Sequence, residues 1–538
     1  MVFARTPQQQ EIVDAAVAGL SLKVKAFAGC TKTTTLVMVS EELGHNCLYL
    51  AYNKKMQLEA VEKFPENVEV RTVHSMAYQV FGAKMAHKLA RPKGPYRNVC
   101  GTASEIARAY KIFDIVCPNG KKVLAASIGK AVKDTVAAFE NSANDHIGSQ
   151  HVRFGKIKKF IQAGLIKQHG IEQKILENAK RLWEARVDMN DPTIATHETY
   201  LKLYQLSKPN LGGAFKTIFL DEAQDSNDCV LDIVLSQKAQ VIIVGDDYQA
   251  IYQWRGSINA LDKVAFTEKS LTTSFRFGSG VAEVANRILN QTVSADVRGN
   301  PAVTTVVHRF PQKVAYPYTK IFRTNAALLL EAVDLIASGV AIQIEVDFKD
   351  LIRAFESAEA LFQGRTKDVK HDLFLGCETW EDAKFEADSN GEIARIVKLI
   401  ENGQYLHITS VLSNYKPPEN PQVIYITAHK SKGLEWDVVV IADDYPSAYK
   451  DGKWVLPEAE RNLQYVANTR AKKVLHAGRI LHEIDDFYAG GGGDAVEHSF
   501  DAEDEHDIIK EAEYEQRYTD YVQAQIKKLK SDALPWEE

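Results

Sequence analysis

A loop rich in glycine and threonine near the start of the chain has the composition of a phosphate-binding site. The loop, Ala26–Thr33 (AFAGCTKT), follows an apolar run and leads into a helical pattern. Backbone N–H groups at a helix N-terminus can hold phosphates. Lys32 would place its charge at the β- and γ-phosphates, and the hydroxyl of Thr33 would bind Mg²⁺. The predicted phosphate-binding residues are Gly29, Cys30, Thr31, Lys32, Thr33 and Thr34.

The loop departs from the regular Walker A pattern at two positions. Ala26 stands where the pattern opens with glycine, and Thr31 stands where glycine precedes the lysine. A β-branched residue in a loop that needs unusual backbone angles costs about 1–3 kcal/mol. Taken alone, the segment is also compatible with an ordinary strand–turn–helix that carries a surface lysine. Thr31 therefore leaves the rate of nucleotide hydrolysis open.

A pair of carboxylates follows a second apolar run. Residues 216–220 (KTIFL) lead into Asp221 and Glu222, the first residues of the sequence DEAQD. Asp221 at a strand end can hold Mg²⁺ directly or through water, and Glu222 can orient and activate the attacking water. Most isolated acidic pairs are surface turns. The apolar strand before this pair favours the catalytic interpretation.

A third polar segment, Gly245–Gly256 (GDDYQAIYQWRG), follows the next apolar run. Open parallel sheets bind ligands at the carboxyl ends of their strands. Gln249 is predicted to sense the γ-phosphate or the attacking water. Tyr252, Trp254 and Arg255 suit stacking on exposed bases. The alternative is that both aromatic residues belong to the core.

The elements that would position these groups alternate between strands and helices, which predicts an α/β fold with parallel sheets. Residues of about 83–205 are instead helical and rich in lysine, for example at 121–133 and 156–173, and predict an inserted helical subdomain. The pattern between about 340 and 418 is mixed and assigns no fold. Predicted strands cover 22–27, 47–52, 68–72, 216–220, 240–245, 320–322, 423–427 and 437–442, and predicted helices cover 32–42 and 54–63.

Charge is unevenly distributed over the 538 residues, whose net charge is −6. Residues 494–538 contain 14 acidic and 5 basic side chains, whereas the other 493 residues contain 60 basic and 57 acidic ones. Four glycines, Gly490–Gly493, precede this acidic tail and predict a linker. The tail is predicted either to dock a protein partner, to mimic DNA charge over a basic channel, or to be merely solvated.

Composition limits the class of protein. A hydrophobic share of 45% and a charged share of 25% are typical of globular chains. No apolar run approaches the roughly 18 residues of a membrane span, and the N-terminus has no secretory pattern. The six cysteines include no CxxC pair, which argues for reduced thiols and against a zinc or iron–sulfur site. We expect a cytoplasmic protein without membrane contact.

The ordered motifs resemble those of superfamily 1 DNA helicases of the UvrD/Rep/PcrA type. The resemblance covers residues 6 to about 480. The loop AFAGCTKTTTL is most similar to the F-box DNA helicase branch, although no F-box-like segment precedes it. Besides the three segments above, the motifs are TPQQQ from Thr6, AYNK from Ala51, TVHS from Thr72, SFR from Ser274, FRTN from Phe322, TAHKSKGLE from Thr427 and QYVANTRA from Gln464.

The resemblance implies two RecA-like lobes that bind ATP and Mg²⁺ in the cleft between them. Gln9 would read adenine, Phe275 would stack on it and Glu435 would lie near the ribose. Arg276 and Arg470 would reach the γ-phosphate as arginine fingers. The predicted catalytic residues are Lys32, Glu222, Gln249, Arg276 and Arg470, with Thr33 and Asp221 at the metal. The predicted DNA contacts are Tyr52, Asn53, Thr72, His74, Tyr252, Trp254, Arg255, Thr427 and His429.

The resemblance also implies a division of the chain. Lobe 1A would comprise 1–82 and 206–270, and lobe 2A would comprise 271–339 and 419–489. The helical insertion 1B would comprise 83–205, a reduced 2B-like insertion 340–418, and the glycine linker with the acidic tail 490–538.

The implied function is that of an ATP-dependent translocase or helicase on single-stranded DNA with 3′-to-5′ polarity. It would act in DNA repair, replication or recombination control, at single strands or junctions, as a monomer or weak dimer. It would be associated with the nucleoid in a bacterium or phage and nuclear in a eukaryote. Two alternatives stay open: an ATP-gated DNA clamp with slow or no hydrolysis, in which Thr31 is the brake, and the motor subunit of a defence or nuclease complex.

Overall fold

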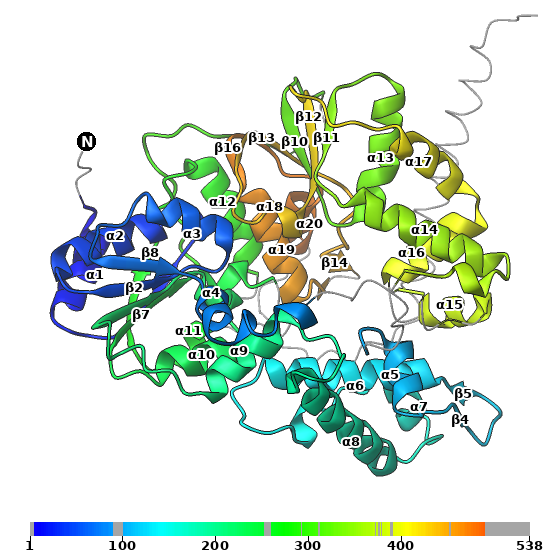
Figure 1. Cartoon of the computed structure of the whole chain (residues 1–538). Coiled ribbons are helices and arrows are strands. Elements are labelled where there is room, and N and C mark those ends of the chain that lie inside the picture. Colours follow the sequence, from blue (N-terminus) through cyan, green and yellow to red (C-terminus); the bar gives the residue numbers. More distant parts are fainter. Residues whose placement is uncertain are drawn as a thin grey trace, which may run out of the picture. The chain divides into compact units, whose positions relative to one another are not determined.

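Two parallel sheets of six strands organise the chain in this computed structural model (Figure 1). The structure describes residues 5–489 apart from 90–99, 252–259, 292, 310–312, 372, 375–376, 378, 388–390 and 451–452. These residues belong to one unit, Met1–Gly492. The predicted α/β class with two RecA-like lobes is confirmed, because both sheets are parallel and each has helices on both faces.

The first sheet brings together strands that are far apart in the sequence. In spatial order it consists of β3 (Val68–Arg71), β2 (Cys47–Leu50), β6 (Thr217–Leu220), β7 (Gln240–Gly245), β1 (Leu22–Ala26) and β8 (Thr267–Leu271). Every residue of β2 and β6 is buried, which is typical of parallel strands covered on both faces. One face packs against α1 (Pro7–Val17), α2 (Lys32–Leu43) and α3 (Lys54–Val61), and the other against α4 (Val73–Ala77), α9 (His197–Leu206), α10 (Asp228–Leu235) and α11 (Ala260–Lys263).

The second sheet has the same layered plan. In spatial order it consists of β11 (Ile342–Ile344), β12 (Val423–Thr427), β10 (Tyr318–Phe322), β13 (Trp436–Ile441), β16 (Ala471–His476) and β9 (Val306–His308). One face packs against α12 (Ser279–Leu289), α18 (Ala428–Ser431), α19 (Glu458–Asn468) and α20 (Ile480–Ala489), and the other against α13 (Asn325–Ala337), α14 (Phe348–Phe362), α15 (Trp380–Ala387), α16 (Gly391–Glu401) and α17 (Gln404–Ser413).

The segment 340–418, to which the sequence pattern assigned no fold, begins with a strand. Its first residues form β11, which pairs in parallel with β12 of the second sheet. The helices that follow share one hydrophobic core with α13, through side chains such as Phe355, Ile396 and Leu412. The strand is only three residues long, and its pattern is too short to separate from the helices around it. Whether these helices correspond to a 2B insertion stays a prediction.

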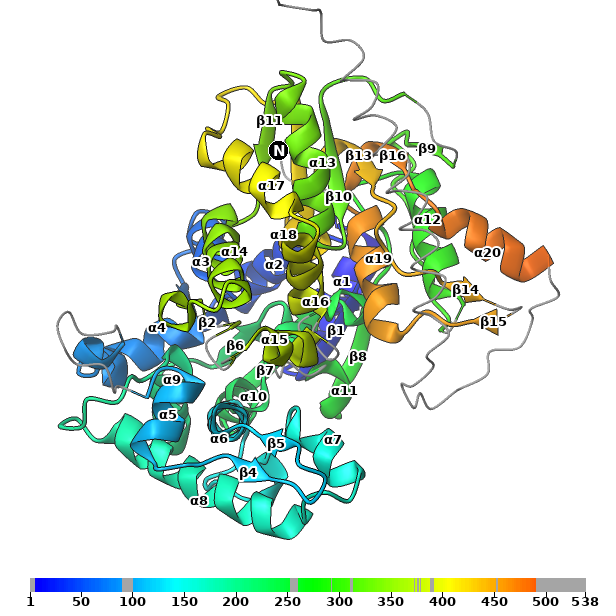
Figure 2. The ribbon, with the colours of Figure 1, turned by 90° about the vertical axis from the view of Figure 1, so that its right-hand side faces the viewer.

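The described residues of the inserted segment before β6 form mainly helices, together with one short hairpin. Helices α5 (Ala103–Ala109), α6 (Ala125–Glu140), α7 (Ile157–Gln162) and α8 (Gln168–Val187) pack on a core of their own with the hairpin strands β4 (Ile115–Val116) and β5 (Lys122–Val123) (Figure 2). The prediction of one helix over 121–133 is therefore wrong at its start. A turn closes the hairpin, with Gly120 at φ +80° and a bond from the Cys117 amide to the Lys121 carbonyl.

Shorter elements complete the described fold. Strands β14 (Tyr449–Lys450) and β15 (Lys453–Trp454) form a separate antiparallel pair. Short 3₁₀ helices lie at Ala86–Lys88, Ser149–His151, Ala223–Asp225, Asp247–Gln249 and Thr366–Asp368, and one π-helical turn lies at Tyr78–Gly82. No helix in the described ranges is long and apolar enough to cross a membrane.

Candidate nucleotide-binding site

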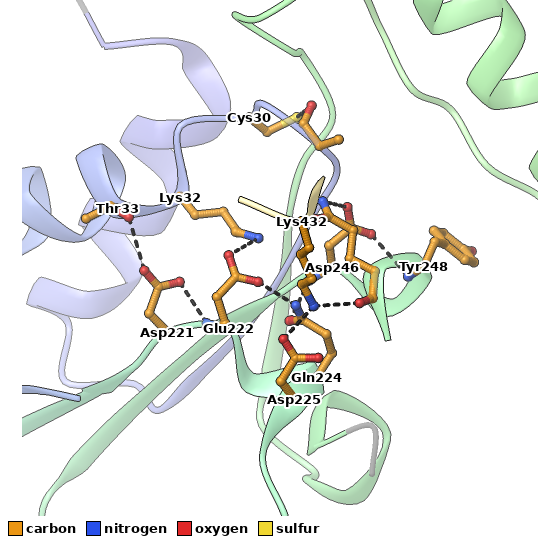
Figure 3. A network of polar contacts seen from close by, with 12 residues as sticks. Cys30, Lys32, Thr33, Asp221, Glu222, Gln224, Asp225, Asp246, Tyr248 and Lys432 are labelled. Carbon is orange, nitrogen blue, oxygen red and sulfur yellow. Dashed lines mark hydrogen bonds and ion pairs between the residues drawn. The ribbon is translucent and has the colours of Figure 1, made fainter. Parts of the chain in front are cut away.

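The three polar segments meet at the carboxyl edge of the first sheet because β6, β7 and β1 are neighbours there. Lys32 begins the helix after β1, Glu222 lies just beyond β6, and Asp246 follows β7 (Figure 3). Residues about 190 positions apart in the chain therefore face one another, as Lys32 and Glu222 do at 2.7 Å. The strand order produces this convergence, since chain connectivity alone does not place β6 and β7 beside β1.

Gly29 is a position of the loop where no side chain fits. Its φ is +76°, and an added Cβ would lie 2.4 Å from Ser274 Oγ and 2.8 Å from Arg276 Cβ. The loop thus touches the segment that carries Arg276 through bare backbone. The Phe275 amide also donates to the Gly29 carbonyl at 2.9 Å.

We expect Gly29→Ala to weaken ATP binding about tenfold or more, because the new methyl group displaces Arg276 and strains the loop. The matched control is Gly44→Ala. Gly44 ends α2, the helix that follows the loop, and has φ +59° with no atom within 4 Å of an added Cβ. The control introduces only the backbone cost of about 1–2 kcal/mol. Equal ATP affinities of the two variants, measured by titration calorimetry, would contradict this view of the loop.

Thr31 adopts the backbone conformation that its replacement of glycine requires. Its φ of +53° lies in the left-handed region, where a β-branched side chain is strained. Its hydroxyl accepts a hydrogen bond from Gln9 Nε2 at 3.2 Å, and that amide also donates to Thr35 Oγ1 at 3.3 Å. Threonine in place of the Walker glycine therefore adds strain to the loop, while the left-handed turn is kept.

Two substitutions separate this strain from the hydroxyl. Thr31→Ala removes the bond to Gln9 but keeps a Cβ at positive φ, whereas Thr31→Gly removes both. We expect the glycine variant to be more stable than the alanine variant by about 1 kcal/mol. For a domain of about 150–250 residues this raises the midpoint of thermal unfolding by about 2–4 °C. An alanine variant that melts at the same temperature as the glycine variant would show that the turn is unstrained.

Lys32 and Glu222 form an ion pair at the centre of the site, with 2.7 Å between Nζ and Oε1. Burial alone would lower the pKa of Lys32, but Glu222 and Asp221 outweigh it and raise that pKa to about 12. Burial would raise the pKa of Glu222, but Lys32 and Lys432 outweigh it and lower that pKa to about 2. Glu222 also has a φ of +51°, a strained conformation of the kind found at functional sites. Both groups are therefore charged at neutral pH.

Asp221 and Thr33 present the oxygen atoms that a magnesium ion would need. Thr33 Oγ1 donates to Asp221 Oδ2 at 3.1 Å, and the Glu222 amide donates to Asp221 Oδ1 at 2.8 Å. No group of three or more His, Cys, Asp or Glu side chains in the described residues could hold a metal by itself. Mg²⁺ is commonly held by one or two carboxylates together with substrate phosphates, so this hydroxyl and carboxylate fit Mg²⁺ that enters with a nucleotide.

Two arginines reach the same site from connecting segments: Arg276 lies between β8 and α12, and Arg470 lies between α19 and β16. Arg276 Nε lies 2.7 Å from Glu435 Oε2, and Arg276 Nη1 donates to the Thr469 carbonyl at 3.1 Å. Arg470 is only 1% exposed and lies 3.5 Å from Gln249 Oε1. Burial and the neighbouring Arg276 lower the pKa of Arg470 to about 9, so it is still mostly charged at neutral pH. Arg276 therefore places a positive group beside the loop at Gly29, and Arg470 places another beside Gln249, where a phosphate chain would balance them.

Two further residues, Lys432 and Tyr465, connect the two sheets, and the sequence reasoning did not assign them a role. Lys432 donates to the Gln249 carbonyl at 2.6 Å and pairs with the buried Asp225. The Tyr465 hydroxyl accepts from the Ala28 amide of the loop at 2.9 Å and donates to Asp246 Oδ2 at 3.0 Å. The only signal for them in the sequence is that Lys432 and Tyr465 lie inside the segments TAHKSKGLE and QYVANTRA.

Two known families match the chain. The UvrD/REP helicase N-terminal domain matches residues 5–263, and the UvrD-like helicase C-terminal domain matches residues 371–477. The chain belongs to the UvrD-like helicase family. The matched ranges contain Lys32, Asp221, Glu222 and Arg470, which the structure brings to one place.

Named relatives are similar over most of this chain. F-box DNA helicase 1 of Gallus gallus is 30% identical in an alignment that covers 89% of this chain and 49% of the relative. F-box DNA helicase protein 1 of Schizosaccharomyces pombe is 28% identical over 87% of this chain and 57% of its own length. DNA helicase IV of Escherichia coli is 23% identical over 84% of this chain and 65% of its own length. The chain thus spans about half to two thirds of these relatives.

The residues predicted to bind the base lie beside the loop of this helicase-family chain. Phe275 is 45% exposed, which leaves its ring available for stacking. Gln9 is buried, and its carbonyl oxygen accepts from the Thr6 amide at 2.9 Å while its NH₂ group binds Thr31. In this arrangement Gln9 supports the loop. Its contact with adenine and that of Glu435 with the ribose stay predictions.

The predicted DNA contacts on the first sheet fall into two groups. Tyr52 is 40% exposed and lines a cavity of about 180 Å³ with His74 and Asp221. Asn53 and Thr72 instead use their side chains as helix caps, accepting from the amides of Met56 and Ser75 at 2.9 and 3.1 Å. Both side chains are therefore already engaged as helix caps, and DNA contact by either residue stays a prediction.

The remaining predicted DNA contacts lie near the second sheet or outside the described residues. Thr427 is buried at the start of α18, and His429 lies on that helix half-buried. Tyr252, Trp254 and Arg255 fall in 252–259, which the structure does not describe.

Proposed function

We propose that this chain is the motor part of an ATP-dependent DNA helicase, which binds ATP between its two sheets and moves along single-stranded DNA. The observation that carries the proposal is that two arginines reach the edge of the first sheet where Lys32 pairs with Glu222. Arg276 lies against the loop at Gly29, and Arg470 lies 3.5 Å from Gln249. Groups of this kind catalyse phosphoryl transfer by positioning and charge neutralisation. The arginines complete the site only while the sheets are together.

The residues suggest how hydrolysis is performed and transmitted. Lys32 binds the β- and γ-phosphates, and Glu222 orients the attacking water and accepts its proton. Thr33 and Asp221 hold Mg²⁺, which neutralises the phosphate charge when bound. Gln249 touches Arg470 and, through its carbonyl, Lys432, so loss of the γ-phosphate changes contacts that join the two sheets. Repeated closing and opening then moves the DNA strand.

Finer properties follow from the family resemblance. We propose 3′-to-5′ movement, a role in DNA repair, replication or recombination control, and action in the nucleoid or nucleus. The acidic tail, residues 494–538, is proposed to dock a protein partner. Deletion of these residues should then remove partners from a pull-down while leaving DNA affinity unchanged.

The inserted helical segment supplies positive charge for DNA. Residues 83–205 contain 21 basic and 11 acidic side chains, although the whole chain is acidic. Lys121 and Lys122 of the hairpin and Lys158 and Lys159 of α7 are exposed, and within the described residues none of the four has an ion pair. The hairpin and α7 pack on one core, so this pair of elements forms a basic surface suited to a phosphate backbone.

We expect the double variant Lys158→Ala/Lys159→Ala to bind DNA about tenfold more weakly at physiological salt. The slope of its log affinity against log salt concentration should be smaller by the contribution of about one to two phosphate contacts. The control is Lys349→Ala/Lys416→Ala, two exposed lysines near the second sheet. Fluorescence anisotropy at several salt concentrations measures both. Equal slopes for the parent and the α7 variant would exclude this surface from the DNA path.

The function is tested by steady-state ATP hydrolysis with and without single-stranded DNA. Strong stimulation by DNA is expected. The clamp alternative rests on the strained Thr31 and is tested by Thr31→Gly. Because Thr31 already has the left-handed conformation, we expect hydrolysis by this variant to stay within about threefold of the parent. A parent without turnover, together with a much faster glycine variant, would favour the clamp over the motor.

A further inference from the structure

A buried tyrosine hydroxyl touches the carboxylate that is proposed to hold the metal. Tyr49 lies on β2, which is the neighbour of β6 in the first sheet, and is 1% exposed. Its hydroxyl donates to Asp221 Oδ2 at 2.5 Å. The ring packs against Phe64 with 4.5 Å between centroids, which fixes the direction of the hydroxyl. Neither the Walker pattern nor the acidic motif includes a residue from this strand.

We propose that Tyr49 is a positioning residue that orients the Asp221 carboxylate for Mg²⁺. This inference rests on the proposed ATPase function. A carboxylate has about four lone-pair positions, two on each oxygen. Oδ2 accepts from both Tyr49 and Thr33, whereas among the described residues Oδ1 accepts only from the Glu222 amide. Tyr49 therefore fills the second position on Oδ2 and leaves Oδ1 as the oxygen with capacity for the metal or its water.

The arrangement explains why a hydroxyl is needed at this buried position. Without it, Asp221 could rotate about its side-chain bonds and exchange the two oxygens, because Thr33 and the Glu222 amide would be the donors left to it in the described part of the chain. Thr33 is itself predicted to bind the metal, so its hydroxyl must contact both Asp221 and the metal. Hydrogen bonds to a metal-binding carboxylate typically change metal affinity about 10–100-fold when removed.

The second sheet contains a matched control. Tyr425 on β12 is 0% exposed, and its hydroxyl donates to Glu331 Oε1 at 2.5 Å. Its ring packs against Phe322 with 4.8 Å between centroids. Tyr425 thus has the burial, strand position and carboxylate partner of Tyr49, but Glu331 lies on α13 and takes no part in the site. A structural effect of losing a buried hydroxyl appears equally in Tyr425→Phe.

The experiment compares the parent, Tyr49→Phe and Tyr425→Phe in the full chain. Affinity for ADP is measured by titration calorimetry twice, in excess Mg²⁺ and in EDTA. The dissociation constant in EDTA divided by that in Mg²⁺ reports how much the metal contributes to binding. We expect Tyr49→Phe to reduce this ratio about tenfold while its affinity in EDTA stays that of the parent. Tyr425→Phe is expected to leave both values unchanged.

Each other outcome overturns a stated part of the account. An unchanged ratio in Tyr49→Phe, or an equal reduction in Tyr425→Phe, rejects the positioning role. Loss of ADP binding in EDTA by Tyr49→Phe alone assigns its hydroxyl to folding of the site and also rejects that role. A parent that gains no ADP affinity from Mg²⁺ instead rejects the proposed ATPase site itself. The Mg²⁺ concentration that half-saturates hydrolysis should rise in parallel in Tyr49→Phe.

Discussion

Replacement of Arg470 by alanine is expected to lower DNA-stimulated ATP hydrolysis by about 10³-fold or more, as loss of an arginine finger does elsewhere. The side chain is held by bonds from Nε to the Val466 carbonyl at 2.8 Å and from Nη2 to Thr469 Oγ1 at 3.1 Å. Nη1 donates to the Leu434 carbonyl at 3.3 Å, and Nη2 also lies 3.5 Å from Gln249 Oε1, which follows β7 of the first sheet. The guanidinium is thus pre-oriented by its contacts at the end of α19 and is proposed to act only when the two sheets meet around ATP.

The pattern of kinetic change distinguishes this role from a structural one. Arg470→Ala should lower kcat while ATP binding stays within about threefold, because the interaction is made mainly in the transition state. Arg470→Lys keeps the charge but loses the fork of donors and should rescue only a small part of the rate. Arg287→Ala serves as the control, since Arg287 lies in the same lobe and pairs with Asp485 away from the site. Equal losses in the Arg470 and Arg287 variants would reject the arginine-finger role.

The second large effect is expected for Lys32→Ala. This variant removes the partner of Glu222 and the positive charge at the phosphates. We expect hydrolysis to fall by about 10³-fold or more and, in contrast to Arg470→Ala, ATP affinity to fall as well. The affinity loss is expected because Lys32 begins the helix that is proposed to hold the phosphates, where its charge would act in the ground state.

The control for Lys32 is Lys23→Ala. Lys23 lies on β1 and pairs with Glu268 at 3.3 Å, so it has a similar ion pair on the same sheet without reaching the site. Hydrolysis by the Lys23 variant should match the parent. ATP affinity and rate are measured together with the midpoint of thermal unfolding, which reports whether either variant is destabilised. A Lys32 variant that hydrolyses ATP at the parental rate would show that the loop is not the catalytic site.

Local pattern was sufficient to predict most strands of both sheets and the polar residues at their ends. The strands at 47–52, 216–220, 240–245 and 423–427 are confirmed as β2, β6, β7 and β12, shortened at some ends. Their apolar runs are long enough and are bounded by polar residues, which is why periodicity finds them. The short β11 and the hairpin strands of two residues fall below the length at which a pattern can be recognised.

Contacts across the fold could not be predicted in the same way. Tyr49 and Asp221 are 172 positions apart, and their contact depends on β2 and β6 being neighbours, which no local pattern encodes. The bond from Ala28 to Tyr465 spans 437 positions and depends on how the two sheets meet. The strain at Thr31 was predictable, because a β-branched residue at a glycine position must adopt the glycine conformation or change the loop.

The most direct test of the motor is ATP-driven movement along single-stranded DNA. Streptavidin bound to biotin at either end of an oligonucleotide blocks a translocating protein, and its release is followed in time. The account predicts that ATP accelerates release from the 5′ end, that the 3′ end is unaffected, and that Lys32→Ala abolishes the acceleration. Release from neither end, despite ATP hydrolysis stimulated by DNA, would contradict the proposal that the contacts between the two sheets convert hydrolysis into movement.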